Sequence, residues 1–515
     1  MHDCNQFGRP ALLSYLNARS ILGAPSEPLS HDVSKEMPMQ TSATTMAQRI
    51  TIAFAAVLVT VALAVAGCSS LSTVATTVSS AATAVPVSIT DAPDDQVIAA
   101  SLTLNSIVLT DASGKTASIL TAPLTFEATH LDAVQAPLFT PAIPEDTYTS
   151  VALTYSNAEV AYIDPTTKQV VQATTTLENA GQSITFSTPV VINNTTTSLL
   201  IDYLVASSVT LSGTTATVTP EFHVAAAPIP PQPTNGTNGL QCGIQGQVTA
   251  LGTDDFTLTT GQGASLVIYV NSSTQYQGLS GFSALVVGVL VEVDTATQTN
   301  GTLLATRVNE QGPPPPTGST PLQMLVGPVT AVIGSPATSF TQVVRQQIGP
   351  SATTTPIQTD TITVNSTTTF QLPGRLPNVM GGTLPFTPAF SGSTLFAGQV
   401  VSVATGGVTS NAATATSVAL SPQTVGGTIA SIATSGGYSV YTVTLTSGGW
   451  LATLTGQTNV TVYANDNVQA INSNPIAVGD SARFNGFLFK NSGSLVLLAC
   501  VQADGPGQPI GPPHP

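Results

Sequence analysis

Charged side chains are scarce in this chain of 515 residues: Asp, Glu, Lys and Arg together make up 7% of it, whereas about a quarter is usual in soluble domains. Basic residues are the scarcest, with 11 Lys and Arg against 26 Asp and Glu. The formal net charge is −15 at pH 7. A chain this acidic repels phosphate backbones, so the composition excludes nucleic acid as a partner.

Groups that carry catalysis are also scarce, with five His and four Cys in the whole chain. His130 and His223 are the histidines of the expected folded part, and neither stands in a recognisable catalytic motif. A small acidic cluster lacks EF-hand spacing and is equally well explained by turn chemistry; its members are Asp91, Asp94 and Asp95. The sequence therefore predicts no cofactor, no metal site and no enzyme.

What the chain has in abundance is Thr, Ser, Ala, Val and Gly. Low charge combined with this much Val and Thr is not a signature of disorder, because enough apolar surface remains to bury. β-branched side chains suit the pleated surface of a sheet. The composition therefore predicts an all-β protein.

A secretory signal is indicated at residues 46–67, where a short cationic start precedes an apolar, Ala/Val-rich stretch at 50–66. The stretch ends at Ala66-Gly67-Cys68-Ser69 and resembles a bacterial lipoprotein signal with its lipobox. An uncleaved transmembrane anchor is the alternative, and the length is just sufficient for one. A plain anchor, however, does not need Gly-Cys-Ser-Ser.

The lipoprotein resemblance implies that the signal is cut before Cys68 and that Cys68 becomes acylated. Several acyl chains hold a protein firmly, whereas one chain binds only marginally. We therefore expect an exported protein, anchored by lipid to the bacterial cell envelope at the outer membrane. Residues 1–45 are expected either to be absent from the native protein or to be disordered, since a signal normally begins at the amino terminus.

Proline-rich joints divide the exported part into four blocks, and proline-rich linkers are stiff spacers. A flexible tether is predicted at 68–84 and a disordered tail at 504–515. The folded blocks are predicted at 85–224, 240–310, 322–422 and 424–503.

The last three blocks look like copies of one unit. Each opens with a Gly-flanked strand, at 246–250, 327–331 and 427–431, and octapeptides 270–277 and 364–371 match closely. A Gly-led strand and an apolar closing strand follow in each copy. Such units suit small closed or partly open barrels, because closure removes exposed strand edges. Segment 334–360 looks like an insertion within the first hairpin of its copy.

The repeats resemble the family known as domain of unknown function 5666, with its Gly-x-Val strand and its Val-Gly-Asp-like centre. Val478-Gly479-Asp480 keeps that centre, whereas Val287-Gly288-Val289 and Ala397-Gly398-Gln399 lack the Asp. The resemblance implies a small β-barrel of the oligonucleotide-binding type, in shape only.

The first block opens with a strand that Pro93 ends, and alternating apolar residues then lead to a turn at 111–114. With Thr90-Asp91-Ala92-Pro93 and a later Pro144-Glu145-Asp146-Thr147-Tyr148, the block resembles the family known as domain of unknown function 4382. That resemblance implies a β-sandwich like those of carbohydrate-binding or transthyretin-like modules, without a known activity. The expected fold is thus an N-terminal β-sandwich followed by three small β-barrel-like repeats.

Two functions from different classes are carried forward. The first is a non-catalytic, membrane-anchored lipoprotein, a β-rich binding or structural module array with envelope proteins or glycan as partners. The alternative is a carbohydrate-binding lipoprotein of a glycan-uptake or degradation system. Exposed aromatics would stack on sugar rings, although an aromatic on a strand is usually core; the candidates are Tyr148, Tyr155, Tyr162 and Trp450.

Cys242 and Cys500 are the cysteines that follow Cys68, and export permits a disulfide between them. The long loop would contribute about 4–5 kcal/mol in the chain-entropy model. The bridge needs Cα atoms within about 7 Å of each other. The alternative is two separate buried thiols, which is common for Cys.

Overall fold

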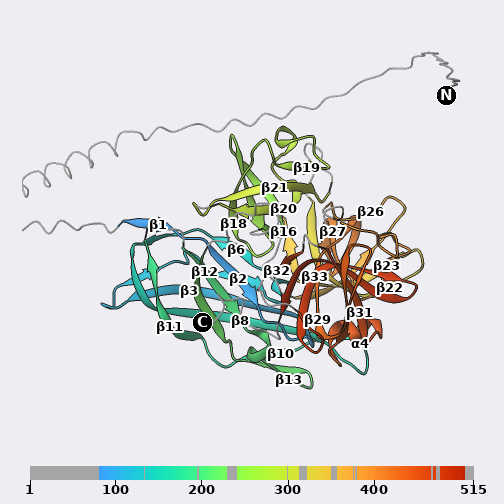
Figure 1. The fold of residues 1–515 in the computed structure, drawn as a ribbon, viewed down its shortest axis with the longest axis horizontal. Helices are drawn as coiled ribbons and strands as arrows, with labels where there is room; N and C mark the ends of the chain where they lie inside the picture. The colour runs from blue at the N-terminus through green and yellow to red at the C-terminus, as the bar shows by residue number, and fades with distance from the viewer. Residues whose placement is uncertain are drawn as a thin grey trace, which may run out of the picture. The chain divides into compact units, whose positions relative to one another are not determined.

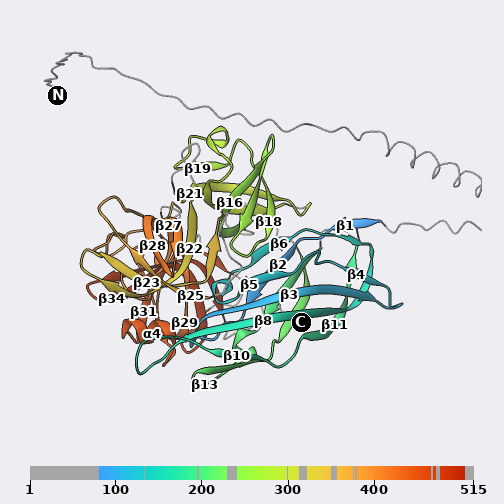
Figure 2. The same cartoon turned by 180° about the vertical axis from the view of Figure 1, so that it is seen from behind.

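The computed structural model describes residues 81–504, apart from 133, 194–196, 229–239, 299, 313–321, 350–356, 375, 377–379, 466–467 and 471–475. These residues belong to one compact unit of the chain, 79–515. The predicted signal, Cys68 and most of the predicted tether lie outside them. Strands run through all four predicted blocks (Figures 1 and 2), which confirms the all-β prediction.

The first block contains two main sheets. One has the order β15 (Phe222–Pro228), β12 (Thr197–Tyr203), β2 (Val87–Asp91) and β6 (Ala136–Phe139). The other has the order β11 (Gly181–Ile192), β8 (Asp146–Ile163), β3 (Val97–Asp111) and β4 (Thr116–Ser118), with β5 (Leu124–Glu127) on β3 and β9 (Val170–Gln172) on β8. Smaller sheets pair β1 (Ala82–Ala84) with β7 (Ala142–Pro144), and β10 (Thr174–Leu177) with β14 (Thr215–Val218) and β13 (Val209–Ser212).

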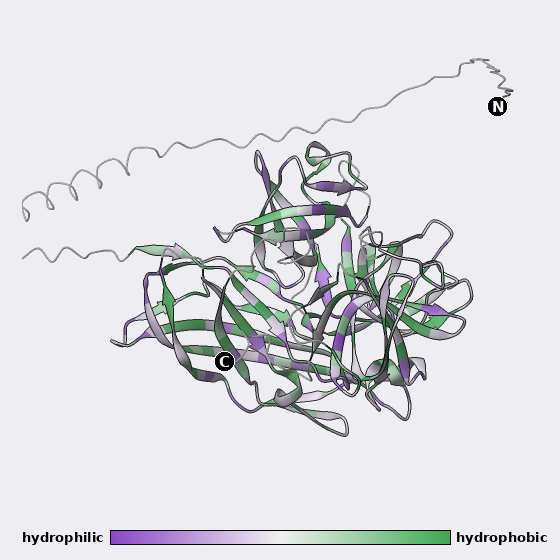
Figure 3. Cartoon of the chain, viewed as in Figure 1, coloured by the Kyte–Doolittle hydropathy of each residue, from purple (hydrophilic) through white to green (hydrophobic). Residues whose placement is uncertain are grey.

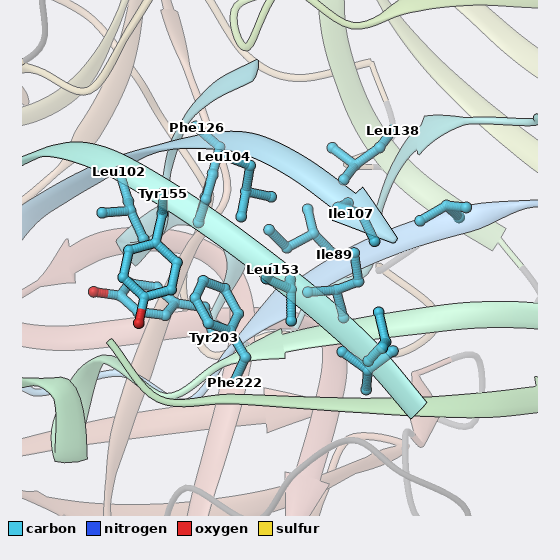
Figure 4. Close-up of a cluster of buried hydrophobic side chains, with 14 of the residues drawn as sticks. Ile89, Leu102, Leu104, Ile107, Phe126, Leu138, Leu153, Tyr155, Tyr203 and Phe222 are labelled. Carbon is cyan, nitrogen blue, oxygen red and sulfur yellow. The ribbon is translucent and has the colours of Figure 1, made fainter. Parts of the chain in front are cut away.

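The core of the first block lies between these sheets, where aromatic rings from both meet (Figure 4). Tyr203 of β12 packs edge-on against Phe126 of β5, with ring centroids 5.7 Å apart. Phe222 of β15 lies 5.8 Å from Tyr155 of β8. The buried rings are large apolar bodies that few other side chains match in area. The predicted β-sandwich is therefore confirmed.

The alternation of apolar residues along β3 changes phase between Leu104 and Ile107, which a regular strand would not allow, because side chains alternate between its faces. The pairing with β8 shifts between Leu104 and Ser106. This bulge leaves Asn105 exposed and returns Ile107 to the core. In Figure 3 the strands of this block accordingly alternate hydrophobic and polar colouring.

The three repeats share one strand order. The first has β18 (Ser265–Tyr269), β17 (Asp255–Thr260), β16 (Leu240–Leu251), β20 (Leu290–Thr297) and β21 (Leu303–Glu310), and β18 also pairs with β21. The second has the same order, with β25 (Gln358–Thr363), β23 (Ser339–Val344), β22 (Gln323–Ile333), β27 (Val400–Thr409) and β28 (Ala412–Leu420), and β25 also pairs with β28. The third uses β31 (Asn459–Ala464), β30 (Tyr438–Leu445), β29 (Gln423–Ser435), β33 (Ser481–Asn491) and β34 (Ser494–Asp504). The predicted barrel-like repeats are confirmed.

The repeated sequence motifs meet one another in space. In the first repeat Gly288 donates its N–H to the carbonyl of Val248, and the same bond joins Gly398 to Val329 and Gly479 to Ile429 in the other two. These glycines have φ of +94°, +105° and +95°, a left-handed conformation that favours Gly. The Gly-x-Val strand and the Val-Gly centre are thus two halves of one backbone contact.

The matching octapeptides form an Asx turn that is tied to the closing strand. Asn271 Oδ1 accepts the backbone N–H of Ser273, and Asn365 Oδ1 accepts that of Thr367. Thr274 Oγ1 then donates to the carbonyl of Ala305 at 2.8 Å. The equivalent bond in the second repeat joins Thr368 to Ala415, also at 2.8 Å. Short strands follow these turns at β19 (Gln275–Gln277) and β26 (Thr369–Gln371), and the third repeat has β32 (Gln469–Ala470) paired with its closing strand β34.

Two expectations about the repeats need correction. The first hairpin of the second repeat, β22–β23, is short, and the extra segment lies after β23, where it forms β24 (Gln346–Ile348) on β22. The opening strand of the first repeat, predicted at 246–250, begins earlier, at Leu240, so Cys242 lies inside β16. Part-buried contacts between blocks also occur: Arg345 donates to the carbonyl of Ile98 and Arg483 to Asp132, although 247 and 351 positions separate the partners.

The helical segments of the described residues are short. They are η1 (Thr129–Leu131), α2 (Val205–Ser208), η2 (Phe282–Ala284) and α4 (Trp450–Thr455). Among the described residues, none of the helices has the length and apolar character needed to cross a bilayer.

Candidate functional site: a buried charged junction

The acidic segment that follows β2 contains Asp94 and Asp95 and lies against the third repeat. The carbonyl oxygen of Asp95 accepts the backbone N–H of Trp450, the first residue of α4, at 2.8 Å. The Asp95 carboxylate accepts the hydroxyl of Thr446 at 2.5 Å. Pro93 ends β2 here because it lacks a backbone donor. The segment is therefore free to leave the sheet and make contacts outside the sandwich.

Arg483 of β33 is the cation of this contact. Its Nη1 lies 2.9 Å from Asp132 Oδ2 and 3.3 Å from Asp95 Oδ1, and its Nη2 lies 3.5 Å from the carbonyl oxygen of Pro93. Thr424 of β29 donates its hydroxyl to the carbonyl of Asp132 at 2.6 Å. The side chains of Arg483 and Asp132 are 13% and 8% exposed, so water screens this ion pair little.

Glu127 and His130 form a second contact that reaches the other two repeats. Glu127 Oε1 accepts the N–H groups of Ala100 and Thr129, and Glu127 Oε2 lies 2.9 Å from His130 Nδ1. His130 Nε2 lies 2.7 Å from the amide nitrogen of Gln262 and 2.8 Å from that of Gln346. One imidazole thereby joins the sandwich to the turn between β17 and β18 and to β24.

Arg345, the residue before β24, completes the arrangement. Its Nε donates to the carbonyl of Ile98 at 2.7 Å, and its guanidinium lies over the ring of Trp450, 5.5 Å from the centroid. A small apolar cluster lies beneath these polar contacts and draws residues from the sandwich and from the second and third repeats: Ile98, Ala99, Ala161, Ile163, Val343, Ile357, Trp450 and Leu454. We call these polar and apolar contacts together the junction.

Burial governs the electrostatics of the junction. It raises the pKa of Asp91 well above its ordinary value, with the neighbouring charge of Asp132 adding to the effect. Burial also raises the pKa of Asp132, to about 6, although the charge of Arg483 opposes it. Burial alone would raise the pKa of Glu127, but the hydrogen bond from His130 and the charge of Arg345 bring it below its ordinary value.

The two arginines respond to burial in opposite ways. Burial lowers the pKa of Arg345 despite the charges of Glu127 and Asp132. For Arg483 the charges of Asp132, Asp95 and Asp91 outweigh burial and raise its pKa. Both guanidinium groups stay protonated at any ordinary pH, so the junction holds two fixed positive charges.

The arrangement is suited to joining blocks. Its charged groups face one another, and within the part of the chain that the structure describes no group of three or more His, Cys, Asp or Glu is placed to hold a metal ion. Both ring nitrogens of His130 lie within hydrogen-bonding distance of protein atoms. The contacts of the junction attach the sandwich to the repeats.

The cysteines predicted from the sequence fall in different places. Cys68 lies outside the described residues. Cys500 is 8% exposed in β34, within an apolar cluster shared by the second and third repeats. Cys242 lies in β16, and its side chain is outside the description. The Cys242–Cys500 disulfide stays a prediction, which mass spectrometry of the unreduced, alkylated protein decides.

The candidate sugar-stacking aromatics are largely buried. Tyr148, Tyr155 and Tyr162 are 2%, 2% and 9% exposed and belong to the core of the first block. Trp450 is half-buried and covered by Arg345. The expectation that strand aromatics are usually core therefore holds for the three tyrosines. His223 is exposed on β15.

The residues that the sequence reasoning missed are His130, Arg345 and Arg483. A signal for the arginines was present in the composition, since seven Lys and Arg follow Cys68 in the printed sequence. A cation this rare in an acidic chain is a candidate for a buried ion pair. His130 had a weaker signal: its charged partner Glu127 lies three positions before it, but its partners in the repeats, Gln262 and Gln346, are uncharged and distant in sequence.

In a comparison with known families, residues 245–309 fit the model of a domain of unknown function, DUF5666. The match covers the first repeat from β16 to β21. No curated protein matches the chain.

Proposed function

We propose that this protein is a non-catalytic lipoprotein of the bacterial cell envelope, held at the outer membrane by acyl chains on Cys68 and serving as a preassembled array of β-modules. One observation carries the proposal: the clustered charged side chains of the first block are used to attach the repeats. Asp95 and Asp132 pair with Arg483, and Glu127 orients His130. These groups serve assembly, which is the property a structural or scaffolding module needs.

The position of the folded unit supports display at a distance from the membrane. The first described strand, β1, begins at Ala82 and pairs with β7. Residues 69–81 thus separate Cys68 from the sheet. Fully extended, a segment of this length spans about 45 Å at roughly 3.5 Å per residue. The anchor would therefore keep the array within about 45 Å of the bilayer and leave its surface accessible to envelope proteins.

The carbohydrate-binding alternative has less support. It needs aromatic side chains that expose a face to a sugar ring, and the tyrosines considered for this role are in the core. Binding of the detergent-solubilised full chain to a glycan array would favour this alternative.

The anchor itself is tested by feeding labelled palmitate to the native host. The label should enter the wild-type protein, which should fractionate with the outer membrane. Cys68→Ser should abolish both the labelling and the membrane association, while Cys500→Ser should change neither. Unchanged labelling of Cys68→Ser would exclude lipidation at this residue.

A further inference from the structure

The junction buries more negative than positive charge. In the described part of the chain its two guanidinium groups, Arg345 and Arg483, interact electrostatically with a larger set of carboxyl groups, and His130 lies at its edge. The carboxyl groups are Asp91, Asp94, Asp95, Glu127 and Asp132, and Asp202 adds a further negative charge that acts on Asp91. Burying unpaired charge is expensive, and a protein usually avoids the cost by changing the protonation state.

Asp91 and Asp132 lie next to each other within this set. Their backbones form a parallel β-bridge, and the two residues are 3% and 6% exposed. Asp91 Oδ1 accepts the backbone N–H of Val205 at 3.2 Å. Asp132 Oδ2 is held by Arg483. The remaining oxygens, Asp91 Oδ2 and Asp132 Oδ1, are buried and have no hydrogen-bond partner among the described residues.

A single proton on the pair would both lower the buried negative charge and supply a missing hydrogen bond. It removes one negative charge from the pair, and it turns a carboxylate oxygen into an O–H donor. Two carboxylates that share a site cannot both ionise at their ordinary pKa. A bound cation would do the same, but the described His, Cys, Asp and Glu side chains offer no group of three or more that could hold a metal ion.

We propose that the Asp91–Asp132 pair holds one proton at neutral pH and that this proton is part of what docks the sandwich on the third repeat. Asp132 connects directly to β33 through Arg483 and to β29 through Thr424. Loss of the proton leaves two adjacent buried carboxylates whose repulsion the charges of Arg345 and Arg483 offset only in part, which weakens the junction. Burial raises the pKa of both groups, repulsion from Asp132 adds to the shift of Asp91, and repulsion from Asp95 adds to that of Asp132. Two adjacent groups of this kind titrate as a unit.

Proton counting during unfolding tests the proposal without a variant. The full-length protein is unfolded in a calorimeter at pH 7 in buffers of different ionisation enthalpy. Both aspartates ionise fully in the unfolded chain at this pH, so unfolding of the wild type should release about one proton. Asp91→Asn should release about one proton fewer than the wild type. The exposed Glu178→Gln should match the wild type. A wild type that releases no proton overturns the proposal.

Docking is followed by fluorescence of Trp450, the single tryptophan of the chain. Over the pH range between the ordinary pKa of the unfolded aspartates and the raised pKa of the folded pair, only the folded state holds the proton, so the wild-type folding equilibrium constant should fall about tenfold per pH unit and level off once the folded pair loses the proton. Asp91→Asn should show a flat profile in this range, and Asp132→Asn serves as the second variant where Asp91→Asn does not fold. A profile of the same slope in the folded variant overturns the proposal. Stabilisation of the wild type by added Ca²⁺ that disappears in the variant also overturns it, because a cation would then occupy the place of the proton.

Discussion

Arg483 Nη1 lies 2.9 Å from Asp132 Oδ2, although 351 positions separate the two residues in the chain. The pair joins the first block to the last repeat, and both side chains are largely removed from water. Breaking a buried ion pair by removing one partner leaves an uncompensated charge. The contact therefore makes the stability of the sandwich depend on the repeats.

Arg483→Met should lower the free energy of unfolding by about 3 kcal/mol, because it leaves Asp132 and Asp95 without their shared cation. Lys115→Met is the matched control, since Lys115 lies 4.0 Å from Asp146 in an exposed pair. Such surface pairs contribute about 0–1 kcal/mol. Urea denaturation of both variants measures the difference. Equal losses of unfolding free energy would show that the buried Arg483 pair stabilises the protein no more than the exposed Lys115 pair does.

Glu127→Gln should destabilise the protein at pH 7 by about 2 kcal/mol, the usual loss for a hydrogen bond to a charged group. The pKa of Glu127 is lowered in the folded state, so its carboxylate stabilises the fold above the ordinary pKa of a glutamate. That stabilisation disappears as the pH falls through the folded pKa. The wild type and the variant should accordingly converge under strongly acidic conditions in pH-dependent thermal unfolding. A gap that stays constant down to low pH would mean that the carboxylate charge has no role.

Gly327→Ala should destabilise the second repeat by about 2–3 kcal/mol or more, the range for forced overpacking. A Cβ at Gly327 would lie 1.8 Å from the carbonyl oxygen of Val343, which is backbone and cannot rotate away. Gly406→Ala is the control, because a Cβ there meets nothing within 4 Å. Thermal unfolding compares the two, and similar midpoints would contradict the close approach of β22 and β23.

The architecture was largely predictable from the sequence because its signals are local. Gly246, Gly327 and Gly427 marked the opening strands, and the octapeptides marked an Asx turn that recurs in the same place. The phase change along β3 was visible as well, although the bulge that it requires was not inferred. The insertion in the second repeat was misplaced because the extra residues form a further strand, β24, on β22.

The junction could not be predicted in the same way. Asp91, Asp94 and Asp95 were noticed as a cluster, but their partners lie far along the chain. Turn chemistry explains aspartates beside Pro93 without any such partner. Only the folded arrangement reveals that this segment leaves the sandwich to contact Trp450 and Arg483.

The sandwich and the repeats are expected to unfold as one assembled unit rather than as a loose string of blocks. Trp450 lies in the junction and is the single tryptophan, so its fluorescence reports docking, whereas far-ultraviolet circular dichroism reports all strands. Urea unfolding of the full-length protein should give the same midpoint by both signals. A fluorescence transition well below the midpoint of the strand signal would contradict the account, because the junction would then open while the blocks stay folded.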